Sequence, residues 1–202
     1  MYLRAAFIET DLVRIEALIR AHSFGVLVTT GADGMDASHI PFAVERVDGR
    51  LVVTGHLAAA NAQCRLFDGG AAMAIFSGPH AYIAPSWYRT QPAVPTWDYV
   101  AVHVHGTMEP VEDHTRMLDQ LADEDPGHFD VRDLPDRFRV GMLAGIRSFR
   151  LAATKVEAQW KMSQNRSVED RMGVIAGLRE QGLDDVAREI EAALPSFPAK
   201  GS

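Results

Sequence analysis

The chain has 202 residues, of which 47% are hydrophobic and 23% charged, as in an ordinary soluble globular protein with one substantial core. A formal net charge of −7 argues against a protein that grips nucleic acid by neutralising phosphates over a broad face, although it leaves room for a small basic patch. The single cysteine, Cys64, excludes a disulfide within the chain and fits a reducing cytoplasm. No signal-peptide core opens the sequence and no apolar run approaches the ~20 residues that span a bilayer. We therefore expect a cytoplasmic protein without a membrane segment.

The first part of the chain predicts a helix and then strands. Thr10 and Asp11 are typical of a helix start, and apolar residues recur at helical spacing over residues 12–19. This helix is expected to cover one end of a barrel. Strands are predicted over residues 24–30 and 51–55, and Asp/Gly turns bound them.

The segment between these two strands, residues 37–44, is strand-like but contains Pro41. Proline cannot donate a ladder hydrogen bond, so the segment is predicted to be an edge, a bulge or a strand broken around a ligand. Strands joined by short Asp/Gly turns form an antiparallel meander, which favours a barrel over a βαβ sheet.

A strand-to-helix turn is predicted after the third strand. His56 should open a short helix that ends near residues 68–70. Free backbone N–H groups at a helix start suit a phosphate. From the residues alone, an ordinary turn is the simpler interpretation.

Residues 73–106 concentrate aromatics, histidines and turn-forming Gly and Pro. An apolar strand over residues 71–76 is expected to close at Ser77-Gly78-Pro79, and a second strand is predicted over residues 99–105. Valines occupy one face of that second strand, and the other face carries Tyr99, Ala101, His103 and His105. The long loop between the strands is predicted to be functional. We expect the large aromatic side chains of this loop, Trp87, Tyr88 and Trp97, to be buried.

The rest of the chain predicts peripheral helices around one last strand. In order, we expect a helix over 111–121, a surface loop over 123–139 leading to a short helix toward 143, a strand over 149–157, and two helices over 168–194 broken at Gly182. The prediction is one domain over residues 1–194, followed by a frayed tail over residues 195–202.

Two further patterns are weak on their own. His103 and His105 project from one face of a strand and could chelate a metal, but a zinc site needs two or more further ligands. Buried, hydrogen-bonded histidines are the preferred interpretation, and no metal is assigned. A helix-turn-helix over residues 168–188 would carry Arg171 and Arg179, but neighbouring acidic residues offset its arginines.

Three blocks carry a family resemblance. Residues 78–88 (GPHAYIAPSWY), 94–106 (VPTWDYVAVHVHG) and 160–166 (WKMSQNR) resemble the signature blocks of the PaiB-type family of FMN-binding negative transcriptional regulators. That family is similar to the pyridoxamine-phosphate-oxidase group. The resemblance extends to about Ala193. It implies a mainly β protein with peripheral helices (α+β), built on an antiparallel six- to seven-stranded split β-barrel of the FMN-binding type. It also implies a homodimer that holds the flavin nucleotide between protomers.

The resemblance also implies where FMN is held. The strand-to-helix turn would grip the flavin phosphate, and Trp87 and Trp97 could stack over the isoalloxazine ring. The oxidases place Arg or Lys beside the phosphate, whereas this turn has none before Arg65, so Lys161 and Arg166 are expected to supply the cations. The implied cofactor-binding residues are Ser38, His39, Thr54, Gly55, His56, Asn61, Trp87, Trp97, Lys161, Gln164, Asn165 and Arg166.

Two other functions stay open beside the regulator. One is an FMN-dependent flavin reductase or oxidase, for which a proton-handling group would come from His39, His56 or His103. The other is a haem- or ligand-binding sensor without catalysis, with a histidine as the haem ligand. Direct DNA binding is not supported by the net charge.

Overall fold

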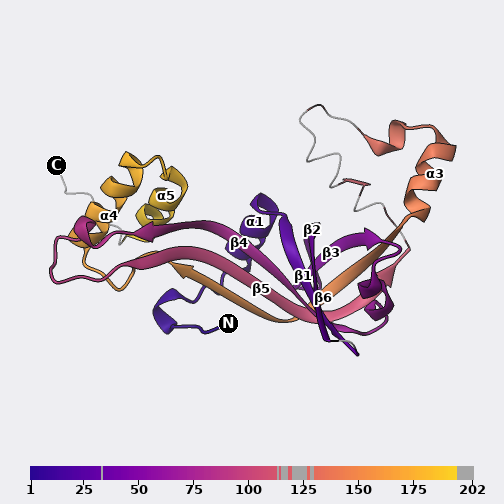
Figure 1. Ribbon diagram of the computed structural model, residues 1–202, viewed down its shortest axis with the longest axis horizontal. Coiled ribbons are helices and arrows are strands. Elements are labelled where there is room, and N and C mark those ends of the chain that lie inside the picture. The colour runs from indigo at the N-terminus through magenta and orange to yellow at the C-terminus, as the bar shows by residue number, and fades with distance from the viewer. Residues whose placement is uncertain (33, 113, 115–117, 120–126, 128–129, 195–202) are drawn as a thin grey trace. The chain divides into compact units, whose positions relative to one another are not determined.

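The computed structural model describes residues 1–194 except 33, 113, 115–117, 120–126 and 128–129. Six antiparallel strands, labelled in Figure 1, form a closed barrel. Their order around it is β1-β2-β3-β6-β5-β4. The strands are β1 (Phe24–Gly31), β2 (Gly34–Val47), β3 (Arg50–Ala58), β4 (Ala71–Ile83), β5 (Thr96–Val111) and β6 (Ile146–Lys161). The α-helices are α1 (Leu12–Ala21), α3 (Asp136–Ala144), α4 (Val168–Glu180) and α5 (Asp184–Ala192). The predicted mainly β barrel with peripheral helices is confirmed.

The chain divides into two compact units. The barrel unit comprises Thr10–Phe76 and Val102–Glu157, and the helical unit comprises Met1–Glu9, Ser77–Ala101 and Ala158–Ser202. Strands β4, β5 and β6 each contribute residues to both units. A single domain over residues 1–194 stays a prediction, and the expected frayed tail lies outside the described residues.

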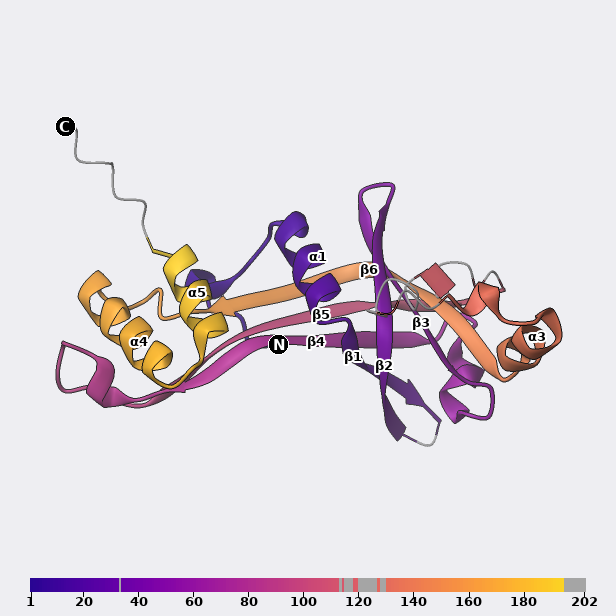
Figure 2. The same ribbon diagram turned by 90° about the horizontal axis from the view of Figure 1, so that it is seen from above.

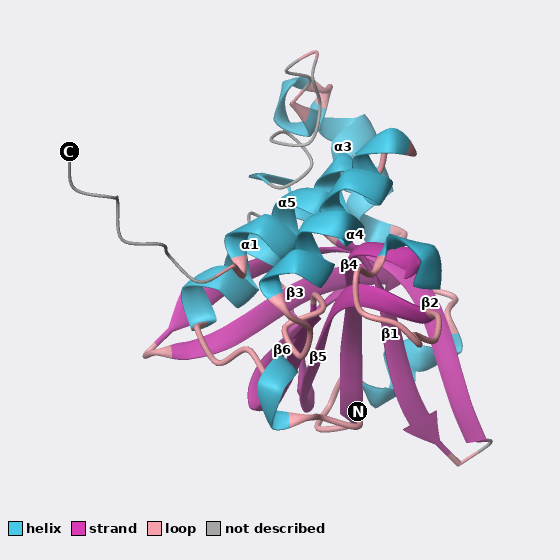
Figure 3. Ribbon diagram, turned by 90° about the vertical axis from the view of Figure 1, so that its left-hand side faces the viewer, coloured by secondary structure: helices cyan, strands magenta, loops and turns pink. Residues whose placement is uncertain are grey.

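The barrel unit begins with α1 and the meander β1-β2-β3. The Asp11 side chain caps α1 by accepting a hydrogen bond from the Val13 N–H at 2.8 Å, as the sequence predicted. Asp48 and Gly49 join β2 to β3 with φ angles of 50° and 78°, the left-handed backbone of a tight hairpin turn. Figure 3 shows β1 and β2 as neighbouring strands of this meander.

Pro41 does not break or bulge its strand, so those two alternatives are wrong; the third, an edge position, fits because Pro41 has a registered partner on one side only. β2 is continuous from Gly34 to Val47. It pairs with β1 up to the register Phe24–Pro41, and it pairs with β3 from Phe42 onward. The proline therefore lies where β2 passes from one partner to the other, and its missing N–H is tolerated there.

An aromatic cluster fills the barrel unit. The Phe42 ring meets the Phe76 ring edge-on at 5.1 Å between centroids, and the Phe67 and Phe149 rings lie 4.9 Å apart. Gly55 of β3 lies against this cluster, because a Cβ there would come within 3.1 Å of the Phe149 ring. The close approach of strand backbone and aromatic ring thus favours glycine at this position, because a larger residue would make the ring shift by a few tenths of an ångström.

The two long strands β4 and β5 extend further into the predicted connecting loop than expected. Gly78-Pro79 does not close β4, which continues to Ile83. β4 is registered with β1 only over Ala72–Ile75, so Pro79 interrupts no bond of that ladder. The connecting loop shrinks to residues 84–95, and Pro85–Trp87 within it form a 3-10 turn. On β5, the predicted valine face is the buried one, because the valines at 100, 102 and 104 are 0–1% exposed.

The helical unit contains α4 and α5, which lie side by side (Figure 2). Gly182 separates them with a φ of 72°, as the sequence predicted. At Gly173 and Gly177, α4 lies too close to Trp87 to leave room for a side chain. A Cβ at Gly177, for example, would come within 2.5 Å of the Trp87 ring. The helix therefore packs directly on the aromatic loop.

The remaining predicted elements are largely confirmed. β6 is longer than the strand expected over residues 149–157, and α3 provides the short helix expected before residue 143. Most of the helix predicted over residues 111–121 lies outside the described residues. In the described part of the chain, no helix is long and apolar enough to cross a membrane.

The aromatic cluster should dominate the stability of the barrel unit. Phe149 is 0% exposed, so Phe149→Ala should lower the free energy of unfolding by about 3–5 kcal/mol through the cavity it leaves. The control Phe138→Ala removes a ring that is 57% exposed, and it should change the stability by less than about 0.5 kcal/mol. Urea denaturation of both variants gives the comparison, and equal midpoints would contradict this account of the core.

Candidate functional site

The structure separates the twelve predicted cofactor-binding residues into two groups. The barrel unit holds Ser38, His39, Thr54, Gly55, His56 and Asn61, and the helical unit holds Trp87, Trp97, Lys161, Gln164, Asn165 and Arg166. Each group has its own internal contacts.

The predicted strand-to-helix turn lies further along the chain than expected. β3 runs to Ala58, so Thr54 and His56 lie within the strand. His56 pairs with Ser148 of β6, and this partner strand carries the ladder past the predicted turn. The following helix is a five-residue 3-10 turn, Ala62–Leu66, and Asn61 caps it by accepting from the Gln63 N–H at 2.9 Å.

A buried side chain that the sequence analysis missed, Gln63, organises the polar residues beside this turn. Its amide is 1% exposed and donates to Thr29 Oγ1 at 3.0 Å. Ser38 Oγ donates to Gln63 Oε1 at 2.5 Å, and Asn61 Nδ2 donates to Ser38 Oγ at 3.1 Å. Because Gln63 is satisfied on every side, it holds the Ser38 hydroxyl and the Asn61 amide in place. No spacing pattern in the sequence singles out this glutamine.

Thr54 lies opposite a cation. On the strand face away from Val53, which is fully buried, Thr54 is half-buried. Its cross-strand partner is Arg150 of β6. Arg150 is held by Glu109, whose Oε2 accepts from Arg150 Nε at 2.7 Å. Arg150 is thus a cation on the strand beside Thr54, which the sequence analysis did not single out.

His56 lies two residues further along the same face of β3. Its cross-strand partner is Ser148, whose hydroxyl lies 2.9 Å from the Nδ1 atom of His114. Burial, with a smaller contribution from the charge of His114, lowers the pKa of the His56 imidazole. The ring is therefore neutral at pH 7 and can both donate and accept a hydrogen bond.

A hollow of about 460 Å³ lies on the barrel unit, within the usual size range of small-molecule sites. It is lined by Glu45, Val47, Asp48, Arg50, Val52, Arg150 and Ala152. It shares Arg150 with the cross-strand pair at Thr54. His39, another predicted site residue, is exposed, and its ring stacks on Phe24 at 6.4 Å between centroids.

The helical unit contains a buried charge pair around Lys161. Its ammonium donates to Thr96 Oγ1 at 2.7 Å and lies 3.2 Å from Asp98 Oδ1. Asp98 is 0% exposed, and it also accepts a hydrogen bond from Ser163 Oγ at 2.6 Å. Burial raises the pKa of the Asp98 carboxyl, against the opposing effect of Ser163 and Lys161. The Lys161 cation is thus engaged with β5.

Arg166 and its neighbours form the second part of this group. The Arg166 guanidinium lies over the Tyr88 ring, 4.3 Å from its centroid. Tyr88 is 4% exposed, and its hydroxyl has no hydrogen-bond partner among the residues that the structure describes. Gln164 closes its own loop by accepting from the Met162 N–H at 2.7 Å, and Asn165 is exposed.

The expected burial of the aromatic residues holds only for Tyr88. Trp87 is half-buried against α4, and Trp97 is 55% exposed. Trp97 meets the exposed Tyr82 ring edge-on at 6.1 Å and the His80 ring at 6.4 Å. Strand alternation explains the difference, because Trp97 precedes the buried Asp98 and points to the opposite face of β5.

The family of this chain follows from its similarity to known proteins. The family model described as "Putative FMN-binding domain" matches residues 1–155. The chain belongs to this FMN-binding family. It is 34% identical over 188 residues to "Protease synthase and sporulation protein PAI 2" of Bacillus subtilis, and the match covers 90% of each protein. The resemblance to the PaiB type is therefore confirmed.

Solved structures agree with this FMN-binding family in fold. The flavocytochrome Anf3 of Azotobacter vinelandii matches with a TM-score of 0.61 at 12% identity, over 85% of this chain and 78% of that protein. The FAD and haem binding protein of Mycobacterium smegmatis matches with a TM-score of 0.59 at 16% identity, over 82% and 78%. The protein is thus an FMN-binding split-barrel protein of the PaiB type.

The residues of the barrel unit fit the family's cofactor. A flavin phosphate takes hydroxyl, amide and guanidinium donors. Thr54, Asn61 and Arg150 carry these groups, whereas the single hydroxyl proton of Ser38 is donated to Gln63.

Proposed function

We propose that the chain holds FMN on the barrel unit and acts, as a homodimer, as a negative transcriptional regulator of the PaiB type. The observation that carries the flavin assignment is the buried Gln63 network. It holds the Ser38 oxygen, which in turn fixes the Asn61 amide after the end of β3 and leaves the second amide N–H of Asn61 to donate to a phosphate. Donors held in place before binding cost less conformational entropy when the phosphate arrives. Thr54 and its cross-strand partner Arg150 extend this set of donors along β3.

The flavin assignment can be tested by substitution. Thr54→Val keeps the shape of the side chain and removes its hydroxyl, and it should weaken FMN binding by about 1.5–3 kcal/mol if a hydrogen bond to the phosphate is lost. Asn61→Ala should act in the same direction. Fluorescence titration with FMN measures the affinity, and circular dichroism checks that each variant is folded.

Two further variants give the controls for that titration. Arg65→Ala removes an exposed cation from the same 3-10 turn and should leave the affinity unchanged. Arg166→Ala tests whether the helical-unit group contributes to binding. If the folded Thr54→Val and Asn61→Ala proteins bind FMN with unaltered affinity, the phosphate does not bind beside β3 and the assignment is wrong.

The homodimer proposal rests on the outward face of β4 and β5 in the helical unit. Tyr82 is 47% exposed and Trp97 is 55% exposed, and the two rings contact each other. Exposed aromatic clusters are typical of protein–protein interfaces, and tryptophan is a frequent energetic centre of such interfaces. A second copy of the chain would cover these rings by symmetry.

Trp97→Ala should therefore weaken the dimer by about 2 kcal/mol, or roughly 30-fold in the dissociation constant. Sedimentation equilibrium gives this constant directly. The control Phe138→Ala removes another exposed ring, from the barrel unit, and should leave association unchanged. A monomeric wild-type protein, or a Trp97→Ala dimer of unaltered strength, would contradict the proposal.

The regulatory part of the proposal is constrained by the arginines of α4 and α5. Arg171 is 4% exposed and donates to the Ile190 carbonyl at 3.0 Å. Arg179 pairs with Glu191 at 2.7 Å, and Arg188 pairs with Asp185. These arginines are engaged within the helical unit, so the two helices do not present a basic recognition face. Any operator contact must therefore be small and sequence-specific.

We expect the FMN-loaded protein to bind generic DNA weakly at ~150 mM salt, with a shallow dependence on salt, because few phosphates are neutralised. Selection from a random duplex library should nevertheless enrich one sequence. Tight, sequence-independent binding, or no enrichment at all, would contradict direct repression. Absorbance spectra with FMN and NADPH separate the other functions, because flavin turnover indicates a reductase and a Soret band indicates haem.

A further inference from the structure

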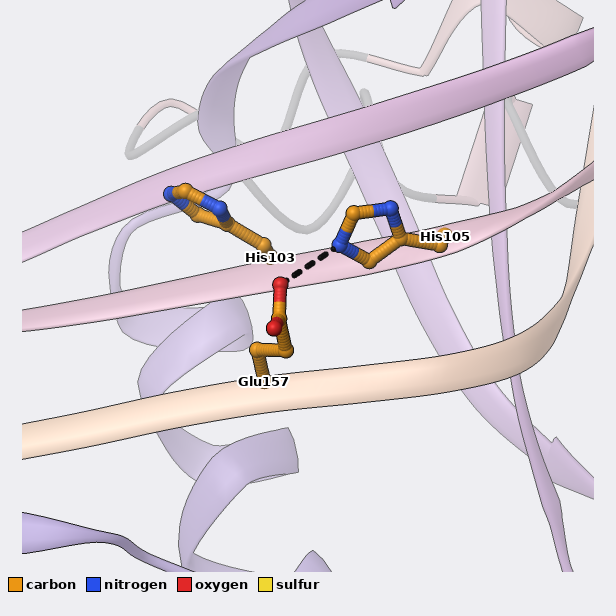
Figure 4. Close-up of side chains that lie close together, drawn as sticks. All are labelled: His103, His105 and Glu157. Atoms are coloured by element: carbon orange, nitrogen blue, oxygen red, sulfur yellow. Dashed lines mark hydrogen bonds and ion pairs between the residues drawn. The ribbon is translucent and has the colours of Figure 1, made fainter. Parts of the chain in front are cut away.

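Two imidazoles and a carboxylate meet on the barrel unit, and none of the three is among the donors assigned to the flavin. His103 and His105 lie on one face of β5, as the alternation predicted, and Glu157 of β6 reaches toward them (Figure 4). One ligand atom from each of the three side chains lies within 4.8 Å of the other two. The sequence analysis found no further ligand for the histidine pair, because Glu157 lies 52 residues after His105.

The carboxylate is already oriented toward one of the imidazoles. Glu157 Oε2 lies 2.9 Å from His105 Nε2, and the Glu157 side chain is 7% exposed. The other oxygen, Oε1, pairs with the ammonium of Lys155 at 2.8 Å. One oxygen of a carboxylate can bind a metal while the other accepts a hydrogen bond, an arrangement that orients ligands in many metal sites.

The second imidazole points to a missing partner. His103 Nδ1 is buried and has no hydrogen-bond partner in the part of the chain that the structure describes. Burying a polar nitrogen without a partner is costly, and such atoms in native proteins call for a specific explanation. The His103 and His105 rings lie 6.3 Å apart between centroids, so one ion can contact a nitrogen of each. A cation between them would satisfy the unpaired atom.

We propose that His103, His105 and Glu157 bind a divalent transition-metal ion of the zinc type, with at least one coordination position left open. Two imidazoles and one carboxylate form a ligand set that zinc uses where it keeps an open position. The ion replaces the proton shared by His105 Nε2 and Glu157 Oε2. The side chain of His105 is 31% exposed, so water or a small anionic ligand can reach the open position. Lys155 acts as a positioning residue.

The geometry needs only small movements. With metal–ligand bonds of about 2.0–2.2 Å, the ligand atoms of a tetrahedral ion lie roughly 3.3–3.5 Å apart. The His105–Glu157 pair must therefore open from 2.9 Å, and the wider separations, at most 4.8 Å, must close. Rotation of the imidazoles about their side-chain bonds supplies such shifts without moving β5 or β6.

The test uses the full-length protein, freed of any affinity tag, treated with EDTA and titrated with Co²⁺ and Zn²⁺ alone. We expect one ion per chain, visible Co²⁺ absorbance typical of a nitrogen and oxygen site, and displacement of Co²⁺ by Zn²⁺. His103→Ala and Glu157→Gln should each lower the affinity at least tenfold. The control His80→Ala removes an exposed imidazole from the helical unit and should leave the affinity unchanged.

A measurement on the unaltered chain keeps the test decisive if a variant fails to fold. Co²⁺ loading should shift the imidazole N–H proton signals of two histidines paramagnetically, since two rings touch the ion. The proposal is overturned if the wild-type protein takes up no ion, if folded His103→Ala or Glu157→Gln binds as the wild type does, or if loading shifts no imidazole signals. Binding is expected with and without FMN, so failure here leaves the flavin assignment untouched.

Discussion

The alternation of side chains along β5 is the constraint on which the rest of this structure depends. One face of the strand carries Val100, Val102 and Val104, which are 0–1% exposed and contribute to the core. The opposite face carries the half-buried His103 and His105. A period of two residues forces this division, because successive side chains of a strand point to opposite sides. The strand therefore builds the core and a polar outer surface at once.

Two networks of buried polar side chains give the molecule much of its chemical character, and partners offset the desolvation of the groups at their centres, Gln63 and Asp98. Gln63 is fully engaged with Thr29, Ser38 and the neighbouring backbone. Asp98 lies between Lys161 and Ser163. Without such partners, burying these groups would cost several kcal/mol each. Networks of this kind hold side chains in one conformation, which suits donors that must meet a phosphate.

Glu157 is also a buried polar side chain with partners, and here the partners act on the charge of its carboxylate. The hydrogen bond from Lys155 is the largest of the effects that lower the pKa of the Glu157 carboxyl to about 2. A carboxylate whose pKa is lower in the folded state than in the unfolded state stabilises the protein above its unfolded pKa, and this stabilisation is lost as the pH falls toward 2. The barrel unit thus keeps an ionised carboxylate beside two imidazoles across the neutral range.

Much of this protein could be read from its sequence, because the relevant patterns are local. The period-two valines, the Asp48-Gly49 turn, the Asp11 cap and the break at Gly182 each depend on neighbouring residues, and the structure confirms them. The three family blocks likewise identified the PaiB type before any geometry was known. Local patterns therefore predicted most of the elements, and the family resemblance implied the split-barrel fold and FMN.

Tertiary structure decided what depends on contacts between distant segments. β3 extends through His56 because β6 pairs with it, and Pro41 is tolerated because β2 changes partner beside it. Gln63 meets Ser38 across 25 residues, and Glu157 meets His105 across 52. No periodicity links residues so far apart in the chain, since only the closing of the barrel brings them together. The buried network beside β3 and the imidazole–carboxylate cluster were therefore visible only in the folded chain.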